Sequence, residues 1–147
     1  MKNDLTIELS AGILNVRVAA WIQKDGQLLV STFPDGTISL PGGRVAFGES
    51  SLEAIQREIL EETGTSILNV EMFAIIENFF RLDVSFHEFL FIYKGDIDSD
   101  NFHSKVDEEQ TISWIPLEEV NKLKPDSLQQ LVNQVQTSQI IHLINND

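Results

Sequence analysis

Hydrophobic positions divide the chain into short apolar stretches and segments with helical spacing. Stretches rich in Val, Ile, Leu, Ala and Phe predict strands, and they are Leu5–Leu9, Asn15–Gln23, Gln27–Thr32, Thr37–Leu40, Ile67–Phe80, Val84–Lys94 and Thr111–Ile115. Asp25 and Gly26 between the second and third stretches predict a β-hairpin.

The C-terminal part has a different pattern. Pro116–Val120 predicts a short helix, and Asp126 or Ser127 predicts the cap of a last amphipathic helix. The residues expected to face inward from that helix are Leu128, Leu131, Val132 and Val135. The apolar tail Ile140–Ile144 fits a final packing strand or a dimer contact. The polar, acidic segment Gly95–Glu109 predicts a mobile loop beside the functional site, its acids solvated or forming a second cation site.

The clearest helix signal lies between Ser50 and Gly64. Ser50 with Glu53 forms a capping-box pattern, and Gly64 is a natural helix stop. Leu52, Ile55 and Ile59 recur at helical spacing and predict a buried stripe. Together these elements predict a single domain over residues 1–147, an α/β/α sandwich with a mixed β-sheet.

This helix carries an unusual group of acids. Glu58, Glu61 and Glu62 stand at i, i+3 and i+4, so their carboxylates converge. Glu62 projects about 20° from Ile55 and therefore lies at the edge of the apolar stripe. The acids repel one another at the helix end where the dipole disfavours negative charge. A bound cation would compensate, and carboxylate ligands without Cys or His indicate Mg²⁺ or Mn²⁺.

The spacing around these acids is specific. Gly43, five residues, Glu49, seven residues and then Arg57 to Gly64, REILEETG, fits the pattern G-x5-E-x7-R-E-U-x-E-E-x-G-U, where U is aliphatic. This segment resembles the Nudix box, residues 43–65, of the Nudix (MutT-like) hydrolases. Only Thr65 departs from the pattern, and it leaves the acids untouched. The segment WIPLEEV, residues 114–120, also resembles one found near the end of Nudix domains.

The resemblance implies a hydrolase of phosphoanhydride bonds that splits a nucleoside diphosphate linked to some group X. The implied metal ligands are Glu58 and Glu62, helped by Glu61, and the carbonyl of Gly42. Glu61 is the favoured general base, with Glu88 as the alternate.

Three arginines have further expected roles. Arg57 is expected to pair with Glu49 and to orient the neighbouring glutamates. Arg17 and Arg44 are expected near the substrate phosphates.

Two predicted strands contain acids. Glu88 shares one face with Phe86 and Leu90, so it is an acid in a core strand. A salt bridge to Arg81 or Arg17 and a fourth acid at the metal site are equally open interpretations. Glu77 is a weaker candidate of the same kind, and on the opposite face His87 fits a packing role better than a catalytic one.

Composition restricts the partners. Acids outnumber Lys plus Arg by 23 to 10, for a net charge of −13, which disfavours nucleic acids and anionic membranes but not a small phosphorylated substrate. The chain has no cysteine, no signal peptide and no membrane-spanning stretch, so a cytoplasmic location is expected.

Substrate identity stays open at this point. Pro or Tyr markers downstream of the box, typical of enzymes for ADP-ribose or dinucleoside polyphosphates, are replaced by Phe80, Arg81 and Leu82. A nucleoside triphosphate or a nucleotide sugar remains, and Phe33, Phe79 and Phe80 are candidates for stacking a base. The alternatives are a non-catalytic nucleotide sensor, which the intact acids disfavour, and an RNA 5′-end pyrophosphohydrolase, which the charge disfavours.

Overall fold

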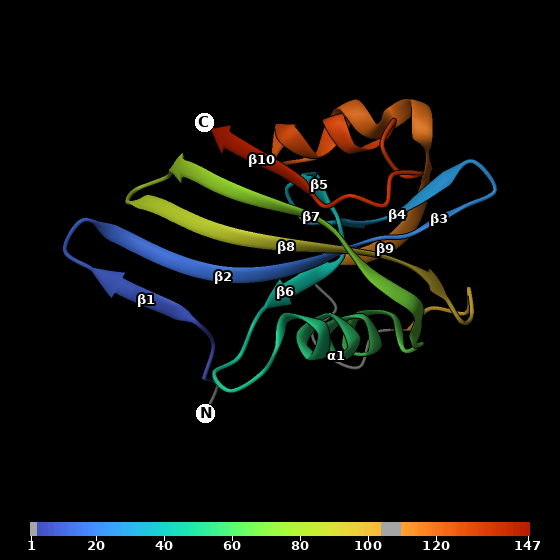
Figure 1. Cartoon of the computed structure of the whole chain (residues 1–147), viewed down its shortest axis with the longest axis horizontal. Coiled ribbons are helices and arrows are strands. Elements are labelled where there is room, and N and C mark those ends of the chain that lie inside the picture. Colours follow the sequence, from blue (N-terminus) through green and yellow to red (C-terminus); the bar gives the residue numbers. More distant parts are fainter. Residues whose placement is uncertain (1–2, 104–109) are drawn as a thin grey trace.

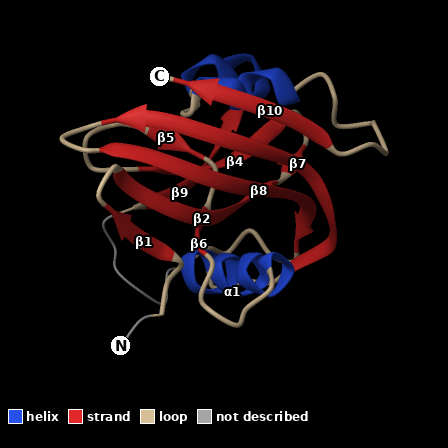
Figure 2. Cartoon of the chain, turned by 60° about the vertical axis from the view of Figure 1, so that its left-hand side comes forward, coloured by secondary structure: helices blue, strands red, loops and turns tan. Residues whose placement is uncertain are grey.

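The computed structural model describes residues 3–103 and 110–147. A mixed sheet lies at its centre, with one α-helix on one face and two 3-10 helices on the other (Figures 1 and 2). The strands are β1 Thr6–Leu9, β2 Gly12–Trp21, β3 Gln23–Lys24, β4 Gln27–Thr32, β5 Ile38–Ser39, β6 Gly42–Arg44, β7 Ile67–Arg81, β8 Ser85–Ile97, β9 Thr111–Pro116 and β10 Ile141–Asn146. The helices are α1 Ser51–Thr63, η1 Leu117–Lys122 and η2 Asp126–Leu131.

The larger sheet has six strands. Its order is β1-β2-β8-β7-β10, and β6 also pairs with β2. The pairs β2–β8 and β7–β10 are parallel, while the other pairs of this sheet are antiparallel. A smaller sheet joins β4 to β3, β5 and β9. The predicted α/β/α sandwich with a mixed sheet is therefore confirmed.

Alternating side chains give the larger sheet two apolar faces. On the η1–η2 face, Trp21 and Ile92 pack with Leu128 of η2. On the α1 face, Ala20 packs with Ile55 and other residues of the helix. Because β2 and β8 contribute residues to both clusters, they connect the two helical layers.

The predicted hairpin differs in one respect. The chain leaves the larger sheet after Trp21, and Gln23 and Lys24 form the short strand that pairs with β4. Asp25 and Gly26 have φ values of 52° and 75°, as a tight turn between right-twisted strands requires. The predicted strand Asn15–Gln23 is therefore shared between two sheets, which a continuous apolar stretch does not reveal.

The C-terminal predictions are partly wrong. The last helix is a single 3-10 segment that ends at Leu131. After it come Val132, Asn133 and further residues that favour helices weakly. The expected inward residues are nevertheless buried or packed on the core. The apolar tail forms β10, the strand alternative, and pairs with β7.

The predicted loop Gly95–Glu109 is also shorter than expected. β8 continues to Ile97, and the loop then docks on α1, where the His103 N–H donates to the Thr63 carbonyl at 2.9 Å. Lys24 pairs with Asp100 of this loop at 2.8 Å. Residues 104–109, with the suggested second cation site, lie outside the described residues.

Candidate active site

Helix α1 begins and ends where its capping residues indicate. The Ser50 hydroxyl accepts from the Glu53 N–H, the Glu53 carboxylate accepts from the Ser50 N–H, and Gly64 ends the helix with φ 78°. Ile55 and Ile59 are buried, but Leu52 is 40% exposed, so its place in the buried stripe was wrongly predicted. In the first turn Ser51 contacts the sheet instead, through a 2.6 Å hydrogen bond with the Tyr93 hydroxyl.

Arg57 lies at the centre of the acids. Its Nε and Nη2 donate to both oxygens of Glu49, at 2.7 and 2.9 Å, so the predicted pair is present. Its Nη1 donates to Glu58 at 2.8 Å and to Glu61 at 3.3 Å, and Nη2 also reaches the Arg44 carbonyl at 3.0 Å. The hydrogen bonds from Arg57 hold the pKa of Glu49 below its usual value. One guanidinium thus joins the loop, β6 and three acids.

The glycine pair lets β6 approach the helix closely. A Cβ on Gly43 would stand 2.4 Å from the Glu58 carboxylate. A Cβ on Gly42 would stand 2.0 Å from the Val18 carbonyl oxygen of β2. Gly42 therefore requires glycine because backbone atoms of β2 lie against it, whereas a side chain at Gly43 would displace the Glu58 carboxylate.

The Gly42 backbone faces away from β2. Ala20 donates to the Pro41 carbonyl at 2.9 Å, and antiparallel pairs alternate between bonded and non-bonded. The next pair, Ala19 with Gly42, is therefore a non-hydrogen-bonded pair. The amide and carbonyl of Gly42 consequently point outward from this edge, and the amide is near Glu62.

Glu62 is the acid of the site that its surroundings perturb most. Both of its carboxylate oxygens are buried without a hydrogen-bond partner; the Gly42 amide favours the charged form but does not reach hydrogen-bond geometry. Burial first, and then repulsion from Glu58, raises the pKa of Glu62 to about 8. Burial also raises the pKa of Glu58, against the opposing effect of Arg57. Glu58 is paired with Arg57, whereas Glu62 has no ion-pair or hydrogen-bond partner.

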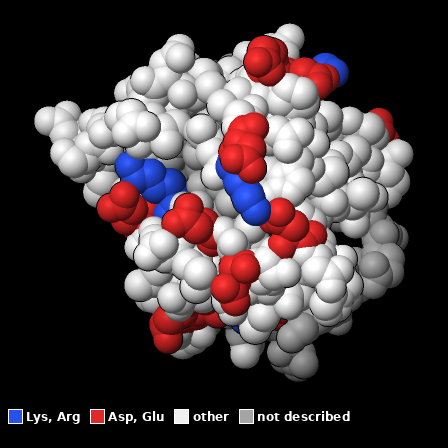
Figure 3. Space-filling view, turned by 90° about the vertical axis from the view of Figure 1, so that its right-hand side faces the viewer, with Lys and Arg blue, Asp and Glu red and all other residues white. Residues whose placement is uncertain are grey.

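Arg17 lies near this group, and Arg44 is its partner on the neighbouring strand. Arg17 and Arg44 are direct partners across the β2–β6 pair, so their side chains leave the same face. Arg17 is close enough to lower the pKa of both Glu58 and Glu62. Like charges placed directly opposite repel each other, so this pair is a ready contact for an anion. In the view of Figure 3, basic side chains lie between acidic ones.

Glu88 is held by amides rather than by a cation. It is 8% exposed and accepts from Asn15 Nδ2 at 2.8 Å and Asn78 Nδ2 at 3.4 Å. Among the described residues, Arg81 instead donates to Ser85 at 2.9 Å, so the suggested salt bridge to Arg81 is absent. Asn15 and Asn78 were missed in the sequence, although Asn is uncommon in strands and both lie within predicted ones.

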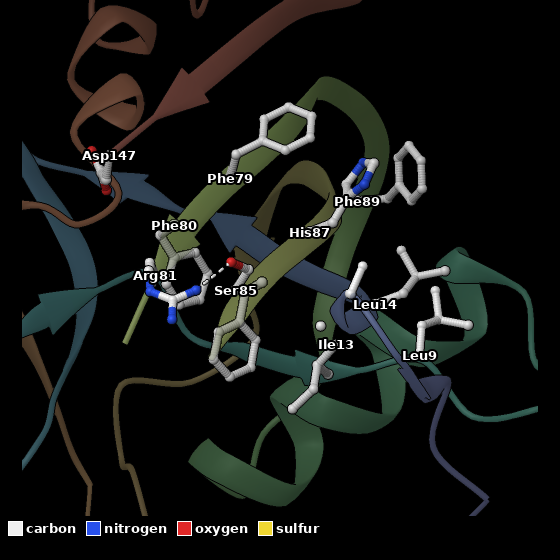
Figure 4. A pocket seen from close by; sticks show the side chains of 13 residues that line it. Leu9, Ile13, Leu14, Phe79, Phe80, Arg81, Ser85, His87, Phe89 and Asp147 are labelled. Carbon is white, nitrogen blue, oxygen red and sulfur yellow. Dashed lines mark hydrogen bonds between the residues drawn. The ribbon is translucent and has the colours of Figure 1, made fainter. Parts of the chain in front are cut away.

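The remaining candidates lie away from α1. Glu77 pairs with His142 at 2.7 Å. Phe79 and Phe80 both line a cavity of about 530 Å³, which lies where β2 and β8 begin and β7 ends (Figure 4). Beside it Phe80 stacks on Phe86. His87 also lines this cavity and contacts the Phe79 ring, consistent with a packing role.

A family model for the NUDIX domain matches residues 13–134. The chain belongs to the NUDIX family. This confirms the family expected from the box and the enzyme class, a Nudix hydrolase acting on phosphoanhydride bonds.

Solved structures have the same fold. A MutT Nudix hydrolase from Burkholderia pseudomallei is 22% identical with a TM-score of 0.68, covering 84% of this chain and 98% of that chain. A Nudix hydrolase from Nitrosomonas europaea is 27% identical with a TM-score of 0.62, covering 81% and 86%. An ADP-ribose pyrophosphatase from Streptococcus suis is 17% identical with a TM-score of 0.66, covering 89% and 98%. The first and third likenesses concern the fold alone.

Within residues 3–103 and 110–147, no helix has the length and apolarity needed to cross a bilayer.

Proposed function

We propose that this Nudix protein is a Mg²⁺-dependent pyrophosphohydrolase of a nucleoside diphosphate linked to a group X. The observation that carries the proposal is the Glu62 carboxylate, whose two buried oxygens lack any partner and lie next to Glu58. A buried carboxylate without a partner is costly, and a cation ligated there would remove the cost.

The residues fit such a cation. Glu58 and Glu62, with Glu61 and the outward carbonyl of Gly42, would hold it, and all four offer the oxygen atoms that Mg²⁺ or Mn²⁺ prefers. In the described chain, no three acids or histidines stand close enough together to enclose a cation as they are. Arg57 bonds to Glu58 and Glu61, so at least one of these side chains must turn. When bound, the metal would neutralise the diphosphate and acidify a water molecule.

The chain supplies the other roles. Arg17 and Arg44 would bind and orient the substrate phosphates. Arg57 holds the acids in place through its contacts with Glu49 and with the helix. We assign the general base to Glu61, which is partly exposed and therefore accessible to water. Glu88 remains the alternate base.

For the substrate we propose a nucleoside triphosphate or a small nucleotide sugar. The net charge of −13 argues against a nucleic acid, although Arg17 and Arg44 provide a local basic site. A homodimer also remains a prediction, because Ile140 and Ile144 are both more than half exposed and could contact a second copy of the chain. A cytoplasmic location also remains a prediction.

The experiment is phosphate release from a nucleotide panel, with and without Mg²⁺, and with added pyrophosphatase to reveal pyrophosphate. The panel contains NTPs, dNTPs, oxidised dGTP, ADP-ribose, nucleotide sugars, dinucleoside polyphosphates and a 5′-triphosphorylated RNA. Mg²⁺-dependent turnover of one class is the expected result. Tight binding without turnover would instead support the nucleotide sensor.

A further inference from the structure

A row of buried polar side chains crosses four adjacent strands of the larger sheet. Asn15 on β2, Glu88 on β8, Asn78 on β7 and Asn145 on β10 are all buried. Asn15 and Asn78 donate to Glu88, and Asn145 donates to Asn78 Oδ1 at 2.9 Å. The row ends where the Ser127 N–H of η2 donates to Asn145 Oδ1 at 3.1 Å.

A purely structural row would not need a carboxylate at its centre. Burying a charged carboxylate with only neutral donors is far more costly than burying an amide. Glutamine at position 88 would accept from Asn78, and its own amide could donate to Asn15. Asn15 Oδ1 is buried without a partner in the present arrangement, so the acceptor for that bond already exists. The row therefore keeps an acid that its internal hydrogen bonds do not require.

The position of Glu88 relates it to the phosphate contacts. Asn15 lies directly opposite Glu88, and Arg17 lies directly opposite Arg44. Asn15 and Arg17 are two residues apart on one face of β2, which is about 7 Å along the strand. A substrate whose phosphates contact Arg17 and Arg44 thus has its next chemical group beside the polar row.

An aromatic surface follows on the same face. Two residues further from Glu88 and Asn78, Phe86 and Phe80 stack with ring centroids 4.8 Å apart. Both rings and Ile13 line one part of the 530 Å³ cavity, and Phe79 and His87, whose side chains leave the opposite face, line another part of it. Phosphate contacts, hydrogen-bonding groups and stacked rings are therefore aligned along β2, β8 and β7.

We propose that Glu88 is a specificity residue that accepts hydrogen bonds from two neighbouring donors on the non-phosphate part of the substrate, with Phe80 and Phe86 against its planar ring. The inference rests on the proposed hydrolysis and adds the recognition of X or its nucleoside. A carboxylate accepts such a donor pair from a guanine edge, N1–H with the 2-amino group, or from the 2′- and 3′-hydroxyls of ribose. Asn15 and Asn78 position the carboxylate.

The test compares Glu88→Gln with the wild type in kcat/KM for GTP, ITP, ATP and their 2′-deoxy forms. Glu77→Gln is the matched control, since Glu77 is a carboxylate on β7 whose side chain leaves the other face. We expect Glu88→Gln to lower kcat/KM about 10- to 100-fold for the substrate that carries the donor pair, mainly through KM. Substrates without the pair should change by less than about threefold, and the melting temperature should be kept.

The substrate pattern separates the two sources. Loss of a preference for GTP over ATP and ITP identifies the guanine edge, and loss of a preference for ribonucleotides over deoxyribonucleotides identifies the diol. An equal fall in kcat for every substrate would overturn the inference and support Glu88 as the alternate base. Unchanged kinetics would overturn it as well.

A binding measurement keeps this test independent of turnover. Calorimetric titration with GMP, AMP and dGMP reports selectivity even if no substrate is hydrolysed. Selectivity present in the wild type and lost in Glu88→Gln would support the inference while the proposed hydrolysis failed. Equal selectivity in both proteins would refute it.

Discussion

Glu62→Gln is the substitution that tests the acid group most directly. It keeps the shape of the side chain and removes a charge that both burial and Glu58 disfavour. We expect the metal-free variant to be more stable than the wild type while its turnover falls by orders of magnitude, because a cation ligand is lost. Gain of stability with loss of activity is the signature of a functional acid in a costly position.

The size of the effect follows from the pKa of Glu62, about 8 in the folded protein and ordinarily 4.5. The folded state holds the proton more tightly, so this group contributes most stability below pH 4.5 and loses it as the pH rises to 8. At pH 7 the loss is about 3 kcal/mol, and at pH 5 about 1 kcal/mol. Glutamine has no such loss. The variant should therefore melt roughly 6–12 °C higher at pH 7 and roughly 2–4 °C higher at pH 5.

The assay is thermal unfolding by calorimetry or circular dichroism between pH 5 and 8, in EDTA and again in Mg²⁺. Glu118→Gln is the control, because Glu118 is an exposed acid of η1 that lies outside the acid group of α1. Added Mg²⁺ should stabilise the wild type more than Glu62→Gln. A variant that melts like the wild type at every pH, or that keeps its turnover, would refute the assignment of Glu62.

Three further predictions concern the same site. Arg57→Ala should lower the unfolding free energy by about 1–3 kcal/mol at pH 7, and less at low pH, because the Glu49 pairing is lost on protonation. Wild-type melting of this variant would exclude the structural role. Gly43→Ala should lower turnover, since its Cβ would displace the Glu58 carboxylate, and full activity would show that the position of this carboxylate is not needed. Arg17→Ala should raise KM more than it lowers kcat if the arginine binds phosphate; an unchanged KM in steady-state kinetics would exclude that contact.

Local patterns in the sequence were sufficient for α1 and for the contact between Glu49 and Arg57. Ser50, Glu53 and Gly64 act within a few residues of the helix ends, so its limits could be predicted. The Glu49–Arg57 pair follows from a fixed spacing across one short loop. No local pattern indicated that the apolar strand before Asp25 is shared between two sheets.

The polar row could not be predicted from local patterns either. Its members come from strands that are neighbours only because β8 pairs with β2 and β7 pairs with β10, both in parallel. Asn15 and Asn145 stand at opposite ends of the chain, and no periodicity relates them. The sequence singled out Glu88 as an unusual acid, but its partners depended on the strand order.

Arg57 also affects the metal-free form of the proposed site. Its contacts with Glu49, Glu58 and Glu61 give the folded chain a built-in counter-ion. The helix can therefore form in metal-poor surroundings, without waiting for an ion to relieve the repulsion. A cation at the proposed site would compete with Arg57 for Glu58 and Glu61. We therefore expect the site to bind the cation weakly, so that the fraction of occupied protein follows the free cation concentration.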